Sequence, residues 1–378
     1  MDREIVMKHF AALHAIPEPG FAEVKTSAYL AQALKAAGYA MTTGIGGTGV
    51  VGVLNGGKPG KTVMVRADMD ALVHPIGGKD TAVHSCGHDA HCSMVLTMAE
   101  AVAADVKGGA TFPGRLKILF QPAEEKLTGA LSVIEAGAVA DVDIALGFHL
   151  RPIQEAKMGQ ATPALYHGAS YILEAAVTGT TAHGARPHLG VNAIDAAAAV
   201  VTAVNAIHMN PVVPWTAKTT KLQAGGASLN AIPDCADMAF DLRAQDNGVM
   251  EALIEKVKRS IEAGAATVGA KATVTVKGGV PAAEYDLGLV KVAREAIARV
   301  LGANGVLDPI VSPGGEDFHF FAKKIPGLRA AYIGLGCDLT PGLHHPEMKF
   351  NTAALPDGVS ILYEMLQGVW VESMEEEL

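Results

Sequence analysis

Four short, continuous apolar runs constrain the fold of this chain more than any other feature. They occupy residues 61–70, 115–125, 142–150 and 328–338 and read KTVMVRADMD, RLKILFQPAEE, VDIALGFHL and LRAAYIGLGCD. Such runs are typical of strands buried on both faces, and helical patterns such as CSMVLTMAEAVAADV (92–106) lie between them. This alternation predicts an α/β fold with a mainly parallel sheet.

The middle of the chain follows a different order of elements. Strand-like and helix-like segments alternate there as β-α-β-β-α-β, at residues 171–179, 192–207, 219–226, 235–244, 249–266 and 271–278. This order is typical of a ferredoxin-like sandwich. Because 378 residues also exceed what one hydrophobic core normally supports, we expect a small α+β domain (165–280) inserted into a larger α/β domain made of 1–164 and 281–378.

Composition excludes several classes of protein. The net charge of −9 comes without any long run of Lys or Arg, so the sequence offers no basic face for nucleic acid. No apolar stretch approaches the roughly 20 residues that a membrane span needs, and the N-terminal MDREIVMKHF lacks the apolar region of a secretory signal. Four scattered cysteines do not make a disulfide framework. We therefore expect a cytoplasmic protein with reduced thiols and with no membrane or nucleic-acid partner.

Polar residues stand at the ends of the four apolar runs. In chain order they are Asp68 and Asp70, Glu124 and Glu125, His149 and, after a further loop, His344 and His345. In open α/β sheets, ligands bind outside the carboxyl ends of the strands. The sequence therefore predicts that these side chains and those of the segment HSCGHDAH (84–91) converge in one crevice.

The segment 84–91 concentrates ligand-type side chains in one turn. We expect Asp89 to be the N-cap of the helix that follows, with His88 just before the first turn and His91 just inside it. Gly87 lets the turn between Cys86 and His88 tighten without a Cβ clash. The alternative is a helix cap in which Cys86 is only a small buried hydrophobe. The paired C-x2-C motifs of structural zinc sites do not occur in the sequence.

Six motifs, in chain order, carry a resemblance to a known family: HSCGHDAH, FQPAEE, GFHLRP, GGASLNAIPD, GGEDF and GLHHP. Together they resemble the M20 metallopeptidase family, in particular its amidohydrolase branch of N-acyl amino acid aminoacylases, hippurate hydrolases and indole-acetyl amino acid hydrolases. The resemblance extends over nearly the whole chain. It implies an α/β dimetal catalytic domain with an inserted lid or dimerisation domain, which agrees with the order of elements described above.

The resemblance also implies a set of site residues. Two divalent metal ions would be held by Cys86, His88, Glu125, His149 and His344. Mn or Zn is the expected metal, and Co or Ni is also compatible with such mixed ligands. Glu124 would be the general base that takes a proton from water and passes it to the leaving amine. Asp70 would orient an imidazole ligand and fix its tautomer.

Several residues near the motifs have less defined roles. Asp68 takes a place where other branches of the family carry a histidine ligand, and a structural role for it stays open. We expect His84 and His91 to have packing or orienting roles. His345 is the rival of His344 as a ligand, and the proline after the pair favours His344.

The inserted domain would contribute contacts to the substrate. By the resemblance, His183 of TAHGARPH would reach the active site, often that of the partner subunit, and donate to the scissile carbonyl. Asn230 and Arg243 would bind the carboxylate or amide of the substrate. Glu316 and Asp317 of GGEDF would line or brace the site. The resemblance thus implies a homodimer built through the inserted domain.

The favoured function is hydrolysis of the amide bond in N-acyl or aryl-acyl amino acids, which are small-molecule substrates. Three alternatives stay open: a dipeptidase or carboxypeptidase-like exopeptidase that uses the same site, a noncatalytic metal-dependent binding protein, and a thiol enzyme with Cys86 as nucleophile. The loop after Asp70 is short and has Val73 where the family commonly has proline. The substrate preference therefore need not follow that of well-known members.

Overall fold

The computed structural model describes residues 3–375, and the chain divides into two compact units. The first comprises Met1–Tyr166, Glu284–Val311 and Asp317–Leu378, as far as these residues are described, and the second comprises His167–Ala283 and Ser312–Glu316. Each unit has its own hydrophobic core. The division into two separately folding domains, one made of 1–164 with 281–378 and the other of 165–280, stays a prediction.

The first unit is built on a seven-stranded sheet. Its strands, in spatial order, are β1 (Ala40–Ile45), β2 (Gly49–Asn55), β6 (Phe112–Gln121), β3 (Gly57–Asp68), β7 (Ile144–Pro152), β17 (Arg329–Leu339) and β8 (Ala161–Thr162). The four central strands run parallel and contain the four apolar runs of the sequence, whereas β1, β2 and β8 pair antiparallel at the edges. The predicted α/β fold is thus confirmed, with a parallel centre and antiparallel edges.

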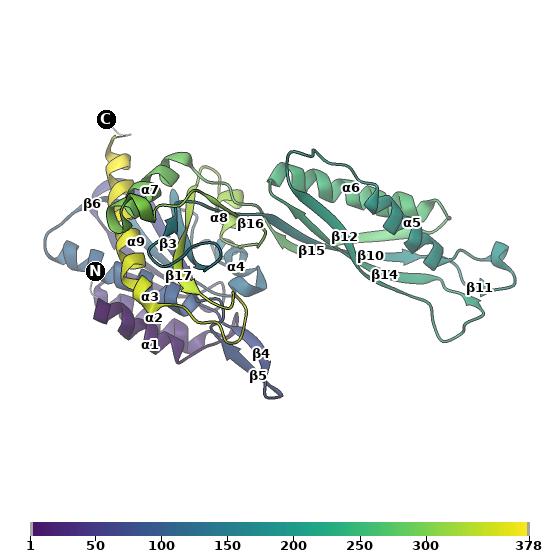
Figure 1. The fold of residues 1–378 in the computed structure, drawn as a ribbon, viewed down its shortest axis with the longest axis horizontal. Helices are drawn as coiled ribbons and strands as arrows, with labels where there is room; N and C mark the ends of the chain where they lie inside the picture. Colours follow the sequence, from purple (N-terminus) through teal and green to yellow (C-terminus); the bar gives the residue numbers. More distant parts are fainter. Residues whose placement is uncertain (1–2, 376–378) are drawn as a thin grey trace. The chain divides into compact units, whose positions relative to one another are not determined.

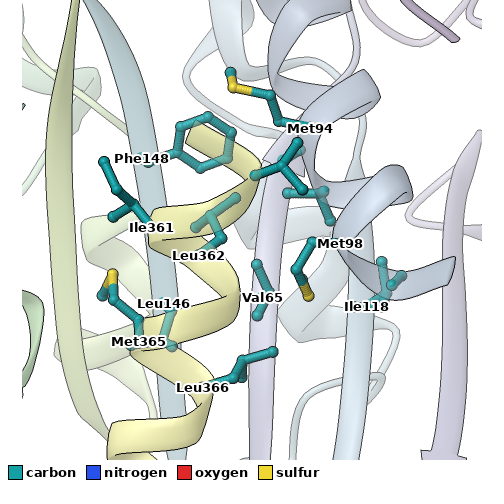
Figure 2. Close-up of a cluster of buried hydrophobic side chains, with 14 of the residues drawn as sticks. Val65, Met94, Met98, Ile118, Leu146, Phe148, Ile361, Leu362, Met365 and Leu366 are labelled. Carbon is teal, nitrogen blue, oxygen red and sulfur yellow. The ribbon is translucent and has the colours of Figure 1, made fainter. Parts of the chain in front are cut away.

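Five helices of the first unit pack together over this sheet. α1 (Arg3–His14), α2 (Val24–Ala37) and α9 (Leu355–Glu375) contact the long helix α3 (His88–Lys107), and α7 (Leu287–Leu301) packs on α9 (Figure 1). Figure 2 shows side chains of α3, α9 and the central strands meeting in the core, among them Met94, Met98, Val65, Ile118, Leu146, Phe148, Leu362 and Leu366. This core fixes the start of α3 relative to the ends of the strands.

Side chains of the central strands alternate between the two faces of the sheet. On β3, Val65 belongs to the core under α3, so Asp68, an odd number of positions away, points to the opposite face. On β7, Phe148 belongs to the same core and His149 lies opposite. The short helices α4 (Gly129–Glu135) and α8 (His319–Lys324) contact each other and strands β6 and β17, respectively.

The remaining elements of the first unit are short. They are the hairpin β4 (Leu72–Ile76) and β5 (Lys79–Val83), the 3-10 turns η1 (Glu124–Lys126), η3 (Ala303–Gly305) and η4 (Thr352–Ala354), and strands β9 (Leu165–His167) and β16 (Ile310–Ser312), which reach into the second unit. Within residues 3–375, no helix combines the length and the apolar composition that a membrane crossing needs.

The second unit has the predicted ferredoxin-like order. Strands β10 (Ala169–Thr178), β12 (Trp215–Ala224), β14 (Cys235–Ala244) and β15 (Lys271–Val280) form an antiparallel sheet in the spatial order β12-β14-β10-β15. Helices α5 (Ala193–Asn205) and α6 (Asn247–Ala266) pack on each other and on this sheet. A separate two-strand pair, β11 (Ala182–His183) with β13 (Ala231–Ile232), and the turn η2 (Pro187–Leu189) complete the unit.

Candidate metal centre

The carboxyl ends of three parallel strands lead directly to ionisable side chains. Asp68 ends β3, Glu124 begins the turn η1 after β6, and His149 lies near the end of β7. Because β6, β3 and β7 are parallel neighbours, their carboxyl ends lie at one edge of the sheet. The fold therefore collects side chains from distant parts of the sequence.

Helix α3 begins earlier than the sequence predicted. Its N-cap is Gly87, at a left-handed φ of 86°, and His88 is the first helical residue. The prediction that Asp89 caps the helix is wrong: Asp89 lies inside the first turn, where its carboxylate is 2.6 Å from His14 Nδ1. Glycine reaches the left-handed conformation without a Cβ penalty, so the chain enters the helix directly after Gly87. Cys86 and His88 thus stand on the two sides of one tight turn.

Metal-ligand atoms of the first unit lie in overlapping groups, with all atoms of a group within 4.8 Å of one another. Three of the groups are Cys86–His88–His149, Cys86–Glu125–His344 and His88–Glu124–Glu125. Cys86 and His88 connect these groups, and Cys86 Sγ lies 3.4 Å from His149 Nε2. The structure therefore brings the five predicted ligands and Glu124 together.

Hydrogen bonds decide which nitrogen of two of these histidines carries a lone pair. His149 Nδ1 donates to the Leu150 carbonyl oxygen at 2.6 Å, so Nε2 of the neutral ring has the lone pair. His88 Nδ1 lies 3.2 Å from Asp70 Oδ1, which places the lone pair of a neutral His88 on Nε2. Among residues 3–375, His88 Nε2 and Glu125 Oε1 are buried and have no hydrogen-bond partner. Buried polar atoms normally have one, so this donor set fits a cation.

Burial and neighbouring charges shift the pKa values of this cluster. Burial raises the pKa of the Cys86 thiol well above its usual value, and the Glu125 carboxylate adds to the shift. Burial also raises the pKa of Glu125 and lowers the pKa of His149 well below its usual value. Burial opposes the charged form of His88, but Asp68 and other neighbours outweigh it and raise its pKa well above the usual value. Because a cation favours thiolate, carboxylate and neutral imidazole, metal binding here would release protons.

Asp68 and His91 are bound to each other and to partners outside the predicted ligand set. Both lie within 4.8 Å of His88 ligand atoms. However, His91 Nδ1 donates to Asp68 Oδ1 at 2.7 Å, and His91 Nε2 accepts from Leu150 N–H at 3.1 Å. Asp68 Oδ2 accepts from Arg66 Nη1 at 2.7 Å. In this arrangement His91 has no lone pair left for a cation.

Asp70 connects a predicted ligand to the turn that carries two glutamates. Asp70 Oδ1 faces His88 Nδ1 and also accepts from Glu124 N–H at 3.2 Å. Asp70 Oδ2 accepts from Glu125 N–H at 3.1 Å. One carboxylate therefore sets the position of an imidazole and of two consecutive glutamates.

Two further buried carboxylates accept backbone hydrogen bonds from residues near the turn η1. Glu23 Oε1 accepts from Ala123 N–H at 2.9 Å, and Asp317 Oδ2 accepts from Ala130 N–H at 2.9 Å. Glu23 was not predicted from the sequence, because it belongs to none of the motifs and lies 100 residues from Ala123. A single acidic residue before a helix carries no signal of a distant contact.

The remaining histidines near the cluster differ in what they face. His344 Nε2 lies 3.4 Å from Glu125 Oε1, and the His344 N–H donates to the Ser85 carbonyl oxygen at 2.8 Å. His345 is exposed, and its Nδ1 accepts from a backbone N–H two residues further on. His84 is buried without a hydrogen bond to its ring nitrogens from the described residues, and burial lowers its pKa.

Two predicted residues of the second unit are neighbours on its small two-strand sheet. His183 lies on β11, and the Asn230 carbonyl oxygen, just before β13, accepts from Gly184 N–H at 2.7 Å. Both His183 and Asn230 are exposed. His183 Nδ1 accepts from Ala185 N–H at 3.0 Å, so the neutral ring carries its proton on Nε2 and can donate from there.

Arg243 lies in the four-stranded sheet of the second unit, on β14, rather than in the β11–β13 pair. Its guanidinium donates two hydrogen bonds of 2.8 Å to the carboxylate of Asp241. Glu316 is buried and belongs to the second unit, whereas Asp317 belongs to the first.

Comparison with known proteins places this site in a family. The model of peptidase family M20/M25/M40 matches residues 64–368. The chain belongs to this family.

Individual relatives match over nearly their whole length. A probable hydrolase of Synechocystis, sll0100, is 33% identical over 93% of this chain and 92% of its own length. A hippurate hydrolase of Campylobacter jejuni is 30% identical over 92% of each chain. The solved structure of YXEP from Bacillus subtilis, described as a dinuclear metal binding peptidase of family M20, matches with a TM-score of 0.82 at 27% identity, over 98% of this chain and 99% of that one.

Membership of M20/M25/M40 confirms the resemblance drawn from the motifs. The matched residues begin inside β3 and end inside α9, so they include the predicted ligands of the first unit and the whole second unit. This M20 family chain is therefore a hydrolase, and its cluster of cysteine, histidine and glutamate side chains is its candidate active centre.

Proposed function

We propose that this chain is a dimetal-dependent amidohydrolase that cleaves the amide bond of N-acyl or aryl-acyl amino acids. The observation that carries the proposal is the pair of buried polar atoms, His88 Nε2 and Glu125 Oε1, without a hydrogen-bond partner among residues 3–375. They lie in one cluster with a thiol and further imidazoles. Paired metal ions held by N, O and S donors are a recurrent device for hydrolysing amide bonds.

Cys86, His88, Glu125, His149 and His344 would hold the two ions. This set fits divalent cations because both His88 and His149 have their lone pair on Nε2, fixed by a hydrogen bond at Nδ1. Mn or Zn would satisfy such a mixed set, and so would Co or Ni. When bound, the ions would lower the pKa of a water molecule and polarise the substrate carbonyl.

Glu124 would act as the general base. It is 7% exposed, and its carboxylate lies within 4.8 Å of ligand atoms of His88 and Glu125. Its backbone N–H is fixed by Asp70, so the carboxylate is held at the cluster. From there a carboxylate oxygen can take a proton from the attacking water and deliver it to the leaving amine.

Residues of the second unit would bind the substrate. His183 would donate from Nε2 to the scissile carbonyl oxygen, as its hydrogen bond at Nδ1 permits. Asn230 and Arg243 would bind the carboxylate of the amino acid product, with Arg243 donating from the edge of its guanidinium that does not bind Asp241. We further propose that the chain is a homodimer joined through the inserted domain.

The hippurate hydrolase of Campylobacter jejuni supports the substrate class. Hippurate is an aryl-acyl amino acid, with an amide next to a free carboxylate, and that relative is 30% identical over 92% of each chain. Val73 lies three residues after Asp70, and the segment expected to be a short loop forms the hairpin β4–β5, so the acyl group preferred by this chain is expected to depend on this hairpin.

A substrate panel with metal removal tests the proposal. N-acetyl amino acids, hippurate, an indole-acetyl amino acid and simple dipeptides are assayed before and after EDTA, and again with Mn²⁺ or Zn²⁺ restored. We expect the acyl amino acids to be cleaved. EDTA should abolish this cleavage, and restored metal should bring it back. Glu124→Gln should keep about two metal ions per chain and lose at least about 100-fold in kcat.

Other outcomes of this experiment point to the alternatives. A requirement for a free substrate α-amino group identifies a peptidase. Turnover that survives EDTA but not thiol alkylation identifies a thiol enzyme using Cys86. Full activity of Glu124→Gln contradicts the general-base role, and metal binding without turnover on any substrate contradicts the proposed hydrolysis.

A further inference from the structure

Three consecutive backbone N–H groups lead into the turn that carries Glu124, and two buried carboxylates bind all three. Ala123 N–H donates to Glu23 Oε1 at 2.9 Å. Glu124 N–H and Glu125 N–H donate to the two oxygens of Asp70, at 3.2 and 3.1 Å. The path of the backbone through this turn is therefore set by side chains from outside it.

The turn needs such support because its backbone is strained. Ala123, the residue before η1, has a φ of 50°, and Leu127, the residue after it, has a φ of 55°. Residues with a Cβ rarely adopt left-handed values, and these persist only where the surroundings hold them. Ala123 is fully buried, so water cannot replace the Glu23 oxygen on its N–H.

Glu23 is itself held in a fixed position. It lies just before α2, is fully buried, and its Oε2 accepts from the Thr48 hydroxyl at 2.6 Å. The segment before it also lies against the turn, since a Cβ built on Gly20 would approach the Ala123 Cα to 2.9 Å. Burial raises the pKa of Glu23, and the hydrogen bonds from Thr48 and Ala123 oppose this shift. A neutral side chain of the same shape therefore suits this position.

We propose that Glu23 is a positioning residue for the general base. Its carboxylate, through the N–H of Ala123, holds the left-handed residue from which Glu124 is directed at the ligand cluster. The hydrogen bonds of the Glu23 carboxylate within residues 3–375 go to Thr48 and the Ala123 N–H and not to a predicted metal ligand, and on this proposal Glu23 does not contact the substrate. The inference rests on the proposed role of Glu124, and it concerns a contact that can be measured without turnover.

Two variants of Glu23 separate shape from charge. Glu23→Ala removes the acceptor for Ala123 N–H, and we expect kcat to fall about 10- to 100-fold, with KM and metal content little changed. In Glu23→Gln the amide oxygen can accept from Ala123 N–H while the amide NH2 donates to the Thr48 oxygen. We expect this variant to recover most of the lost kcat. Loss of kcat in Glu23→Gln equal to that in Glu23→Ala would overturn a positioning role.

Glu18→Ala is the matched control. The Glu18 carboxylate belongs to the same segment and also accepts backbone hydrogen bonds, from Lys25 and Thr26 at 2.9 Å, but it makes none to the turn. We expect Glu18→Ala to lower thermal stability while kcat stays as in the wild type. An equal loss of kcat in both alanine variants would mean that any damage to this segment impairs the enzyme, which contradicts a specific role of Glu23.

Amide hydrogen exchange of residues 121–127 measures the effect of the contact between Glu23 and the Ala123 N–H directly. Glu23→Ala should speed exchange in this peptide, and Glu18→Ala should not; unchanged exchange in Glu23→Ala would overturn the inference. If Glu23→Ala does not fold, Thr48→Val provides the second test, because it frees Oε2 and should give the same changes to a smaller extent. Full activity of Glu124→Gln would reject the general-base role and with it the catalytic part of this inference, whereas exchange at this turn tests separately whether Glu23 holds the backbone of the turn.

Discussion

His88 and His91 lie one helical turn apart at the start of α3, yet their ring nitrogens have different partners. His88 Nε2 is buried without a hydrogen bond from residues 3–375, whereas His91 Nδ1 and Nε2 bind Asp68 and the N–H of Leu150. We predict that His88→Phe loses bound metal and that His91→Phe retains it. Metal content after gel filtration in excess Mn²⁺ or Zn²⁺ measures the difference.

His91→Phe should also destabilise the metal-free protein. His91→Phe leaves a carboxylate oxygen of Asp68 and the N–H of Leu150 without their partner, at a cost of about 1–3 kcal/mol in the free energy of unfolding. Urea unfolding in EDTA measures this cost. Metal lost from His91→Phe but kept by His88→Phe would reverse the two roles.

Residue types at the ends of the strands were predictable, but the atoms that bind were not. Asp70, Glu124 and His149 could be placed at one sheet edge, because buried apolar runs mark parallel strands and ligands gather at their carboxyl ends. The sequence does not show which nitrogen of His149 has the lone pair, since this follows from a hydrogen bond to the carbonyl of Leu150. Glu23 was missed for a related reason: its partner is a backbone N–H 100 residues away.

At the scale of the element, the start of α3 depends on Gly87. Its φ is 86°, and a Cβ there would approach Leu150 Cδ1 to 3.0 Å. We predict that Gly87→Ala destabilises the protein by about 1–2 kcal/mol through backbone strain and shifts Cys86 relative to His88. It should therefore weaken metal retention as well as stability.

Gly109→Ala provides a control with the same kind of strain and no contact. Gly109 follows the other end of α3, has a φ of 98°, and a Cβ there would meet nothing within 4 Å. It should lower stability by a similar amount, with metal retention unchanged. Trp370, buried in α9, can report urea unfolding of the first unit in a Trp215→Phe background. Equal metal loss in both variants would contradict the role given to Gly87.

Most elements were predictable, because periodicity and apolar runs depend on burial. The four parallel strands and the β-α-β-β-α-β order of the second unit followed from them. The cap of α3 did not, since Asp89 has the right side chain for a cap, while the conformation of Gly87 decides where the helix starts. The antiparallel strands β1, β2 and β8 were also not predicted. β1 is mostly exposed and β8 has only two residues, so neither gives a buried apolar run, whereas the apolar run of β2 was missed.

At the scale of the whole molecule, the residues proposed for catalysis and for substrate binding belong to two different units. The proposed metal ligands and Glu124 belong to the first unit, and His183, Asn230 and Arg243 belong to the second. In the proposed homodimer, a site can therefore be completed either within one chain or by the partner's second unit. The resemblance leaves both arrangements open.

Mixing two inactive variants distinguishes these arrangements. Glu124→Gln lacks the base and His183→Ala lacks the carbonyl donor, so each homodimer should be nearly inactive. If the partner supplies His183, a mixed dimer has one complete site, formed by the His183→Ala chain's Glu124 and the other chain's His183. Because half of randomly assorted dimers are mixed, refolding the variants together at equal amounts should restore about one quarter of wild-type activity. Native mass spectrometry verifies that mixed dimers have formed. If these dimers are inactive, Glu124 and His183 of each site lie in the same chain, because no mixed dimer then contains a complete site.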